Sequence, residues 1–314
     1  MRIIRRPTLP LASPSQGKGA DAAIAIGSFD GVHLGHAALL TRVVQEANAR
    51  GLDAGVVTFE PLPREYFSPG TAPARLSSLG ERLCALAGLG LDTAFVERFD
   101  ARFAALTPEQ FEQRLRERYG ARWILVGHDF RYGAKRAGDA ASLAAAGRRL
   151  GFEVEVLPPI ADGGERISST RVRQALERAD FAAARRLLGR PYAISGRVVH
   201  GAKRGKALGF PTANIRLARA KPALSGVFAV KCFGAATRGL EGVASLGINP
   251  AVTVGGPATL EAFLFDFSGD LYGRRLSIEF VQKLRDEAHF ASLDELAAEI
   301  ARDCERAKAI LRGT

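Results

Sequence analysis

Short apolar runs alternate with longer amphipathic stretches between residues 22 and 189. The apolar runs are rich in Val, Ile and Phe and end at glycine or at a charged residue, which is the pattern of buried strands. In chain order they are AAIAIG, AGVVTF, DTAFV, RWILVG and FEVEVL. Strands that alternate with helices predict a doubly wound parallel sheet, which binds ligands outside the carboxyl ends of its strands.

Two of the amphipathic stretches carry recognisable helix ends. Residues 36–51 place their apolar side chains on one stripe, and Gly51 follows as a C-terminal stop. The stripe consists of Leu39, Leu40, Val43, Val44 and Ala47. A later stretch has Thr107 as its cap, Pro108 in the first turn and Gln110 in position to bond back to the cap. Both stretches are therefore expected to be helices.

The pattern changes near residue 190, where Gly189 and Pro191 end the last helix of the first half. Strand-like runs then follow, separated by glycine-rich turns: YAISGRVVH, GVFAVKCF, GVASLG, LEAFLFDF and RLSIEFVQ. The helical pattern resumes over residues 292–311, with Ser292 and Glu295 as a capping box. The apolar stripe of this helix is Leu296, Ile300, Cys304, Ala307 and Leu311. We expect two domains, residues 1–189 and 190–314, the second an antiparallel barrel covered by one terminal helix.

Composition is compatible with this division. A chain of 314 residues is long enough for two domains that each bury a core. Lys and Arg number 44 against 33 Asp and Glu, a formal net charge of +11. Such a surplus suits an anionic partner, whether nucleic acid, a membrane surface or phosphorylated small molecules, and charge alone does not choose among them.

The cysteines and the chain start indicate a cytoplasmic protein. Cys84, Cys232 and Cys304 lie far apart without CxxC spacing, which argues against a zinc cage or a disulfide framework and favours a reducing compartment. Prolines interrupt the opening segment where a signal peptide would need an apolar core. The sequence also lacks an uninterrupted apolar stretch of membrane-spanning length, so we expect no membrane partner.

The stretch GSFDGVHLGH carries the first candidate chemistry. It places a turn between the first strand and a helix, where unpaired amides and the helix dipole favour an anion. His33 and His36 stand one helical turn apart, so both imidazoles can reach one phosphate group and donate hydrogen bonds to it. The candidate contacts in the turn are Gly27, Ser28, Phe29, Asp30 and Gly31. A cap or a metal pair explains the histidines less well, because neither accounts for the flanking glycines.

A second candidate lies downstream at ERISSTRVRQ. Ser168, Ser169 and Thr170 supply hydroxyls and amides where a helix begins, and Arg171 and Arg173 bring positive charge to it. Serine and threonine at a helix start are usually only caps. Three in a row with arginines following, after a strand of a parallel sheet, favour a second phosphate contact.

A glycine-rich basic loop in the second half is the third candidate. Gly201, Gly205 and Gly209 alternate with Lys203 and other basic residues before the segment PTAN leads into a strand. Glycines let amides approach phosphates and basic side chains offset their charge. The loop is not a Walker A motif. From these residues alone, a solvated turn is favoured over a phosphate or RNA contact.

Taken in order, these segments resemble the bacterial bifunctional riboflavin kinase/FAD synthetase family. GSFDGVHLGH is similar to the HxGH signature of nucleotidyltransferases, and ISSTRVR to their second signature. TFEPLPREYF and VGHDFRYGAKRAGD resemble the FMN adenylyltransferase half, and VVHGAKRGKALGFPTANIRL resembles the ATP loop and PTAN motif of riboflavin kinases. The resemblance implies a Rossmann-like nucleotidyltransferase domain in an α/β chain, followed by a kinase β-barrel.

The resemblance also implies roles in the first half. His33 and His36 contact the ATP phosphates and stabilise the transition state, while the residues matching ISSTR bind the departing pyrophosphate. Of these, Arg171 counts with the histidines as catalytic, and the others are Ser168, Ser169 and Thr170. Asp129 matches a position that contacts flavin or nucleotide. The implied reaction joins FMN to the adenylyl group of ATP, giving FAD and pyrophosphate.

In the second half the implied reaction is phosphorylation of riboflavin to FMN with release of ADP. Thr212 and Asn214 match the residues that hold Mg²⁺ and the nucleotide phosphates, and Glu261 matches the general base on the 5′-hydroxyl. Arg285 and Asp286 match the segment that closes over flavin. ATP is a co-substrate in both reactions, and no tightly bound prosthetic group is implied.

Four residues depart from the family pattern: Leu62, Ser245, Ala251 and Phe263. None of them is a residue to which the resemblance assigns phosphate transfer or the general base.

Two other functions remain open at this point. One is an HxGH adenylyltransferase for a different phosphorylated acceptor, with a barrel that only binds flavin. The other is a basic nucleic-acid-binding protein with an OB-like barrel, which is disfavoured because such barrels present aromatics for base stacking and most of the 18 Phe here lie in apolar strand patterns. We therefore expect small-molecule partners, riboflavin, FMN and ATP, and no nucleic acid.

Overall fold

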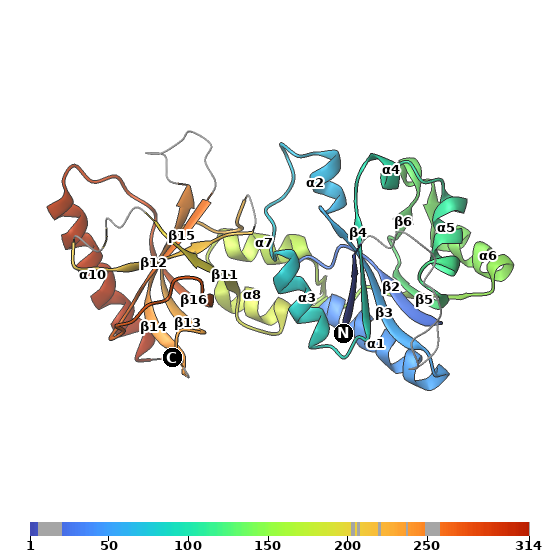
Figure 1. The fold of residues 1–314 in the computed structure, drawn as a ribbon, viewed down its shortest axis with the longest axis horizontal. Coiled ribbons are helices and arrows are strands. Elements are labelled where there is room, and N and C mark those ends of the chain that lie inside the picture. The colour runs from blue at the N-terminus through green and yellow to red at the C-terminus, as the bar shows by residue number, and fades with distance from the viewer. Residues whose placement is uncertain are drawn as a thin grey trace. The chain divides into compact units, whose positions relative to one another are not determined.

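A computed structural model describes residues 1–5, 21–201, 205, 208–218, 221–236, 238–248 and 258–313 (Figure 1). They pack as two compact units, which we call the N-terminal and C-terminal units. The N-terminal unit comprises residues 1–73 and 82–168, and the C-terminal unit comprises residues 74–81 and 169–314. The assignment of separate activities to residues 1–189 and 190–314 stays a prediction.

The N-terminal unit is built on a parallel sheet with the strand order β1-β4-β3-β2-β5-β8. The strands are β1 (Arg2–Arg5), β2 (Ala22–Ile26), β3 (Asp53–Glu60), β4 (Thr93–Arg98), β5 (Ala121–Gly127) and β8 (Glu153–Leu157). The central strand β2 is buried along its whole length. All five strands expected from the apolar runs are present, and the edge strand β1 was not predicted.

Helices and short elements lie between these strands or follow β8 (Figure 1). They are α1 (Leu34–Arg50), α2 (Pro63–Phe67), α3 (Leu79–Ala87), α4 (Ala101–Ala104), α5 (Pro108–Glu117), β6 (Arg131–Tyr132), η1 (Ala134–Arg136), β7 (Gly138–Asp139), α6 (Ala140–Leu150), β9 (Ala161–Asp162) and β10 (Glu165–Arg166). Helix α1 packs on β2, β3 and β5, and it ends at Gly51 with φ of 68°. Thr107 and Gln110 exchange the bonds of a capping box at the start of α5. Both predicted helices are confirmed.

The C-terminal unit contains two short helices and a closed barrel. Helices α7 (Ser169–Glu177) and α8 (Phe181–Leu188) pack on each other, and α8 ends at Gly189 with φ of 72°. The antiparallel barrel closes in the order β11-β12-β15-β14-β13-β16. Its strands are β11 (Ala193–Val199), β12 (Thr212–Arg216), β13 (Gly226–Phe233), β14 (Leu240–Ile248), β15 (Ala258–Leu264) and β16 (Arg275–Arg285).

Helix α10 (Leu293–Leu311) covers part of the outside of the barrel, as predicted from its apolar stripe. Cys304, Ala307 and Leu311 are buried there against Val227 and Val243. The N-cap Ser292 accepts a bond from the Glu295 amide. The predicted fold class, a parallel α/β sheet followed by an antiparallel barrel and a terminal helix, is confirmed. No helix in the described part of the chain is long and apolar enough to span a membrane.

Gly196 offers a test of how tightly the barrel closes. A Cβ at this buried position would lie 2.3 Å from the backbone oxygen of Arg216 on β12, and that atom cannot move alone. We expect Gly196→Ala to destabilise the barrel by about 1–3 kcal/mol and to lower the Tm of its calorimetric transition. Gly313→Ala is the matched control, because a Cβ there would make only an ordinary contact, and its Tm should stay at the wild-type value. An unchanged Tm for Gly196→Ala would contradict this account of the packing.

Candidate functional site

The strand order of the parallel sheet locates a ligand crevice. From β2 the chain moves to β3 on one side, and later to β5 on the other side. Connections that leave neighbouring strands in opposite directions open a crevice at the carboxyl edge of the sheet. Residues 27–36 directly follow β2, and Asp129 lies two residues after the end of β5. Both predicted contacts therefore leave the sheet at its switch point.

The turn after β2 is held in an unusual backbone conformation. Phe29 and Val32 have φ of 50° and 42°, values that side chains with a Cβ rarely adopt, and Gly31 has φ of 81°. Phe29 and Asp30 are buried in spite of the turn's position at the edge of the sheet. Local strain of this kind persists only where surrounding contacts fix it, and it is concentrated at functional sites.

The two histidines stack on each other at the start of α1. Their ring centroids are 3.6 Å apart and the planes are inclined by 16°. His33 is the N-cap, and its Nδ1 accepts a bond of 3.2 Å from the His36 amide. A neutral His33 therefore carries its proton on Nε2, where it is a donor. A Cβ on Gly35 would lie 3.2 Å from the His33 ring, so the glycine of the HxGH motif gives this imidazole its room.

Burial and nearby positive charge make His36 a neutral group. Removal from water is the main cause of a pKa well below the usual range, and His33, Arg166 and Arg82 lower this pKa further. Its Nδ1 is buried without a hydrogen-bond partner among the described residues. An unpaired buried nitrogen is costly, and a ligand that bonds to it offsets that cost. His36 is thus a neutral imidazole in a positive field.

Arg166 is a charged group of this unit that the sequence analysis missed. Its Nη1 lies 2.9 Å from Oδ2 of Asp129, and this bond is the main reason that the pKa of Asp129 is lowered. It also contributes to the low pKa of His36. Arg166 comes from the two-residue strand β10, which has no periodicity to recognise. Its only sequence signal is its position just before the serines of ISST.

The predicted second phosphate contact begins a helix as expected. Helix α7 starts at Ser169, so Ser169, Thr170 and Arg171 occupy its first turn, while Ser168 directly precedes it. Their participation with the histidines stays a prediction.

The barrel brings three of its predicted residues together. Antiparallel register places Asn214 of β12 directly opposite Glu261 of β15, and Ser245 of β14 faces Glu261 from the other side. Directly opposed residues share one face of a sheet. The Thr212 hydroxyl donates a bond of 3.2 Å to Oε2 of Glu261. Glu261 is half-buried in this polar row rather than an ordinary solvent-facing strand residue.

The glycine-rich loop meets the same row. A Cβ on Gly201 would lie 2.3 Å from the Asn214 side chain, so this glycine packs directly against a predicted phosphate contact. Gly205 accepts backbone bonds from Leu208 and Phe210, and Gly209 has φ of 84°. Lys203 lies outside the described residues, and so does Ala251.

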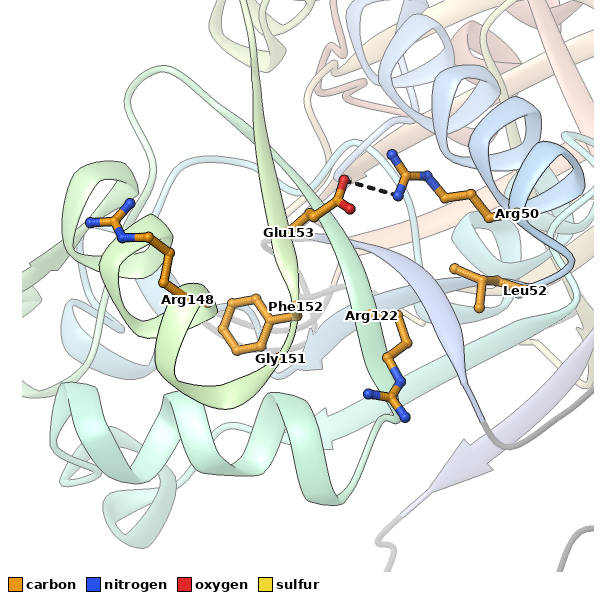
Figure 2. A pocket seen from close by; sticks show the side chains of 8 residues that line it. Arg50, Leu52, Arg122, Arg148, Gly151, Phe152 and Glu153 are labelled. Carbon is orange, nitrogen blue, oxygen red and sulfur yellow. Dashed lines mark ion pairs between the residues drawn. The ribbon is translucent and has the colours of Figure 1, made fainter.

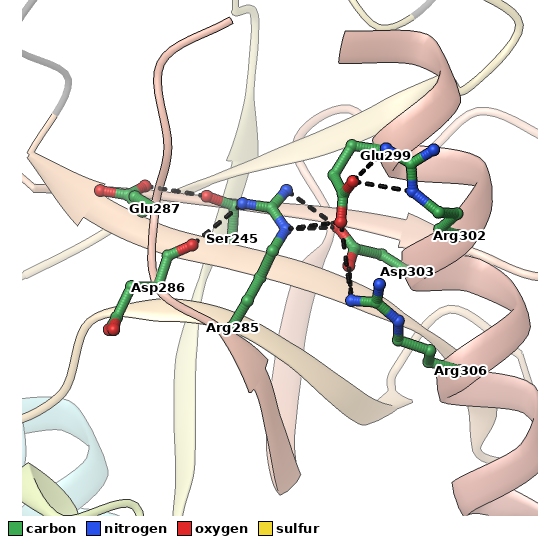
Figure 3. Close-up of polar contacts among 8 residues, drawn as sticks. All are labelled: Ser245, Arg285, Asp286, Glu287, Glu299, Arg302, Asp303 and Arg306. Carbon is green, nitrogen blue, oxygen red and sulfur yellow. Dashed lines mark hydrogen bonds and ion pairs between the residues drawn. The ribbon is translucent and has the colours of Figure 1, made fainter. Parts of the chain in front are cut away.

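Figure 3 shows the surroundings of Arg285 and Asp286 at the end of β16. The Arg285 guanidinium lies 2.8 Å from the buried carboxylate of Asp303 on α10. Asp286 is exposed and accepts a bond from Lys283, which holds its pKa low. Glu287, which follows, accepts a bond of 3.0 Å from Ser245. Arg285 thus ties β16 to α10, and the role of both residues toward flavin stays a prediction.

A cavity of about 530 Å³ opens at the amino ends of β3, β5 and β8 (Figure 2). It is lined by arginines, two of which already face carboxylates: Arg50 pairs with Glu153 at 2.9 Å, and Arg122 pairs with Asp21 at 2.8 Å. Because it lies at the opposite edge of the sheet from the histidines, we assign no nucleotide site to it.

Comparison with known proteins identifies both halves. A sequence model of FAD synthetase matches residues 15–171, and a model of riboflavin kinase matches residues 188–311. A protein of Escherichia coli (strain K12) named bifunctional riboflavin kinase/FMN adenylyltransferase is 47% identical over 304 residues, 96% of each chain. A protein of the same name from Pseudomonas fluorescens is 45% identical over 91% of each chain.

A solved structure shares the whole fold. A crystal structure from Streptococcus pneumoniae, named a macrolide-efflux protein, superposes with a TM-score of 0.79 at 30% identity. The match covers 98% of this chain and 99% of the other. Sheet, barrel and terminal helix therefore recur together in one chain.

The neutral state of His36 can be measured by NMR titration of the imidazole nitrogens, with His36→Gln used to assign the resonances. We expect His36 to stay neutral at about pH 6, where a free imidazole with a pKa of about 6.5 is mostly protonated. Pyrophosphate should raise the pKa of His36, because a nearby anion stabilises the imidazolium. A midpoint at or above that of free histidine in the unliganded protein would show that this account of the site is wrong.

Proposed function

Because the chain belongs to the family of bifunctional riboflavin kinases/FMN adenylyltransferases, we propose that each half works through the polar group located above. FAD synthetase activity resides in the N-terminal half and riboflavin kinase activity in the C-terminal half. The observation that carries the site proposal is the stacked pair of buried His33 and half-buried His36 at the switch point of the sheet. A mere helix cap would need only one of these rings.

In the N-terminal half, a phosphate oxygen of FMN attacks the α-phosphorus of ATP, and the bond to the bridging oxygen of the β-phosphate breaks. The products are FAD and pyrophosphate. His33 donates from Nε2 to phosphate oxygens as their charge develops, and His36 stacks on it as a second donor. Ser168, Ser169, Thr170 and Arg171 bind the departing phosphates, and Arg166 holds Asp129 near the acceptor. The protein contributes positioning and charge stabilisation rather than a covalent intermediate.

In the C-terminal half, Glu261 accepts the proton of the riboflavin 5′-hydroxyl as its oxygen bonds to the γ-phosphorus of ATP and ADP leaves. The bond from Thr212 orients this carboxylate without neutralising it, which a general base requires. Gly201, which has no Cβ, lets the Asn214 side chain pack directly against the loop. Arg285 and Asp286 belong to the segment that covers the flavin.

Magnesium fits the oxygen ligands of this row. Thr212 offers a hydroxyl, Asn214 offers an amide oxygen, and Mg²⁺ prefers oxygen ligands shared with substrate phosphates. The described residues contain no group of three or more His, Cys, Asp or Glu able to hold a metal by themselves. We therefore propose that Thr212 and Asn214 would hold the ion together with ATP, where it would offset phosphate charge.

The remaining proposals concern partners and compartment. Riboflavin, FMN and ATP are the proposed substrates, which accounts for a basic protein without nucleic acid. The match to a riboflavin kinase over residues 188–311 favours a catalytic barrel over one that only binds flavin. The barrel aromatics Phe228 and Phe280 are buried against each other, and buried rings cannot stack on bases. Three unpaired thiols are compatible with the cytoplasm.

If the two activities use separate sites, a substitution in one site should lower only one of the two activities. We expect Glu261→Gln to lower riboflavin phosphorylation by about 10²–10⁴-fold, because the amide cannot accept the hydroxyl proton, while adenylylation of supplied FMN continues. The measurement is chromatography of the flavins formed from riboflavin, or from FMN, with ATP and Mg²⁺ over time.

The reciprocal variant is His36→Asn, which removes the imidazole. We expect FAD formation from FMN to fall by about 10²–10³-fold, with riboflavin phosphorylation at the wild-type rate, so that FMN accumulates. Each variant is the control for the other. Equal loss of both activities in either variant would contradict two separate sites.

A further inference from the structure

Arg82 is a charged side chain with no exposed surface, carried by helix α3. A guanidinium stays protonated throughout the physiological pH range, and its burial is unfavourable unless fixed acceptors replace its water. Its neighbours Leu83 and Leu86 are ordinary core residues of the same helix. The groups that accept hydrogen bonds from Arg82 therefore indicate the role of its buried charge.

These acceptors lie in the turn that precedes the histidines and at the end of the neighbouring strand β3. Nη1 donates a bond of 2.8 Å to the backbone oxygen of Ser28, in the turn after β2. Nη2 donates bonds of 2.9 Å to the backbone oxygen of Phe59 and to Oε2 of Glu60, at the end of β3. One planar group thus links the turn to the neighbouring strand end, which the single ammonium of a lysine cannot do with the same geometry.

The linked turn is the strained one. Phe29, which follows Ser28 directly, has φ of 50°, and so the carbonyl that Arg82 holds adjoins the first unfavourable residue of the turn. The buried hydroxyl of Thr58 is a second donor to the Ser28 oxygen, at a longer 3.3 Å. Without Arg82 the weaker bond from Thr58 would have to oppose the strain.

Arg82 also acts on the histidines through its charge. It is one of the groups that lower the pKa of His36, together with His33 and Arg166. Its carboxylate partner Glu60 is partly exposed and therefore screened by solvent, whereas the buried guanidinium is little screened by salt, so Arg82 adds positive potential at this turn. Arg82 therefore fixes the conformation of this turn and also raises the electrostatic potential there.

We propose that Arg82 is a positioning residue for adenylyl transfer: it holds residues 27–30 in the conformation that receives the triphosphate and adds a fixed positive charge beneath it. This inference rests on the proposed FAD synthetase function of the N-terminal half. Arg82 acts on the turn through its bond to the backbone oxygen of Ser28.

Two substitutions separate its contributions. Arg82→Met keeps the apolar stem but removes both charge and link, and we expect kcat/KM for ATP in FAD formation to fall by about 100-fold. Arg82→Lys keeps the charge but loses the link, and we expect a fall of about tenfold. Thr58→Val, which removes only the longer bond to Ser28, should cost about threefold or less.

The histidine titration supplies a readout that general destabilisation would not move. In Arg82→Met the pKa of His36 should rise above the wild-type value, because a nearby positive charge is gone. In Arg82→Lys it should stay close to the wild-type value. Loss of rate with a retained low pKa in the lysine variant would then isolate the geometric contribution.

Riboflavin phosphorylation by the same preparations is the internal control and should be unchanged. Arg149→Met is the matched control variant, because it removes an arginine that pairs with the buried carboxylate of Glu112 at 3.0 Å, away from the turn. It should lower the Tm of the N-terminal unit while leaving FAD formation at 25 °C at the wild-type rate.

The outcomes are decisive in either direction. Folded Arg82→Met with kcat/KM within threefold of wild type would overturn the proposal. If that variant does not fold, Arg82→Lys decides, and a wild-type kcat/KM for it would equally overturn the proposal. Failure of the wild-type protein to make FAD from FMN and ATP would instead refute the proposed function itself.

Discussion

Two imidazoles stacked 3.6 Å apart cannot both be protonated at low cost, and much of the N-terminal unit follows from this constraint. His36 is the neutral member, so in the proposed site much of the positive charge for a polyphosphate comes from other residues. Arg82 and Arg166 are two such residues on different elements, one on α3 and one on β10. The bond from the His36 amide to His33 fixes which nitrogen donates. Neutral donors in a positive field suit a charge that grows during the reaction.

The proposed kinase site has the opposite electrostatic requirement, because its base must carry a negative charge. A general base must stay negative beside bound phosphates, so its carboxylate cannot be tied to an arginine. Glu261, the base in the proposed kinase site, receives a bond from the neutral hydroxyl of Thr212. Arg285, which the sequence analysis assigned to the segment over the flavin, is instead bonded to Asp303 on α10. Register alone assembles this row, since Asn214, Glu261 and Ser245 are opposed on three adjacent strands. One chain thus carries two phosphate chemistries with different local electrostatics.

Elements that follow from the periodicity of the sequence were predicted. Residues whose role depends on a single tertiary contact were missed. The five parallel strands, the cap of α5, the stop at Gly51 and the terminal helix all followed from local patterns. Arg82 did not, because an arginine beside Leu83 reads as a polar position on an amphipathic helix. Its burial comes from acceptors 54 and 22 residues away in the chain. Arg166 was missed for a related reason, because the strand β10 is too short to show a periodic pattern.

Net charge is a poor guide to where anions bind in this protein. Arg42 and Arg50 on α1 contribute to the surplus of +11, yet both pair with Glu46 and both are partly exposed to screening solvent. Arg82 counts equally in the sum, although it has no exposed surface and acts through protein rather than water. A phosphate in the proposed site responds to distance and dielectric, so the buried guanidinium of Arg82, although paired with Glu60, counts for more there than paired arginines on the surface of α1. In the proposed site, the preference for anions is therefore set by a few arginines that the fold directs to the end of β2.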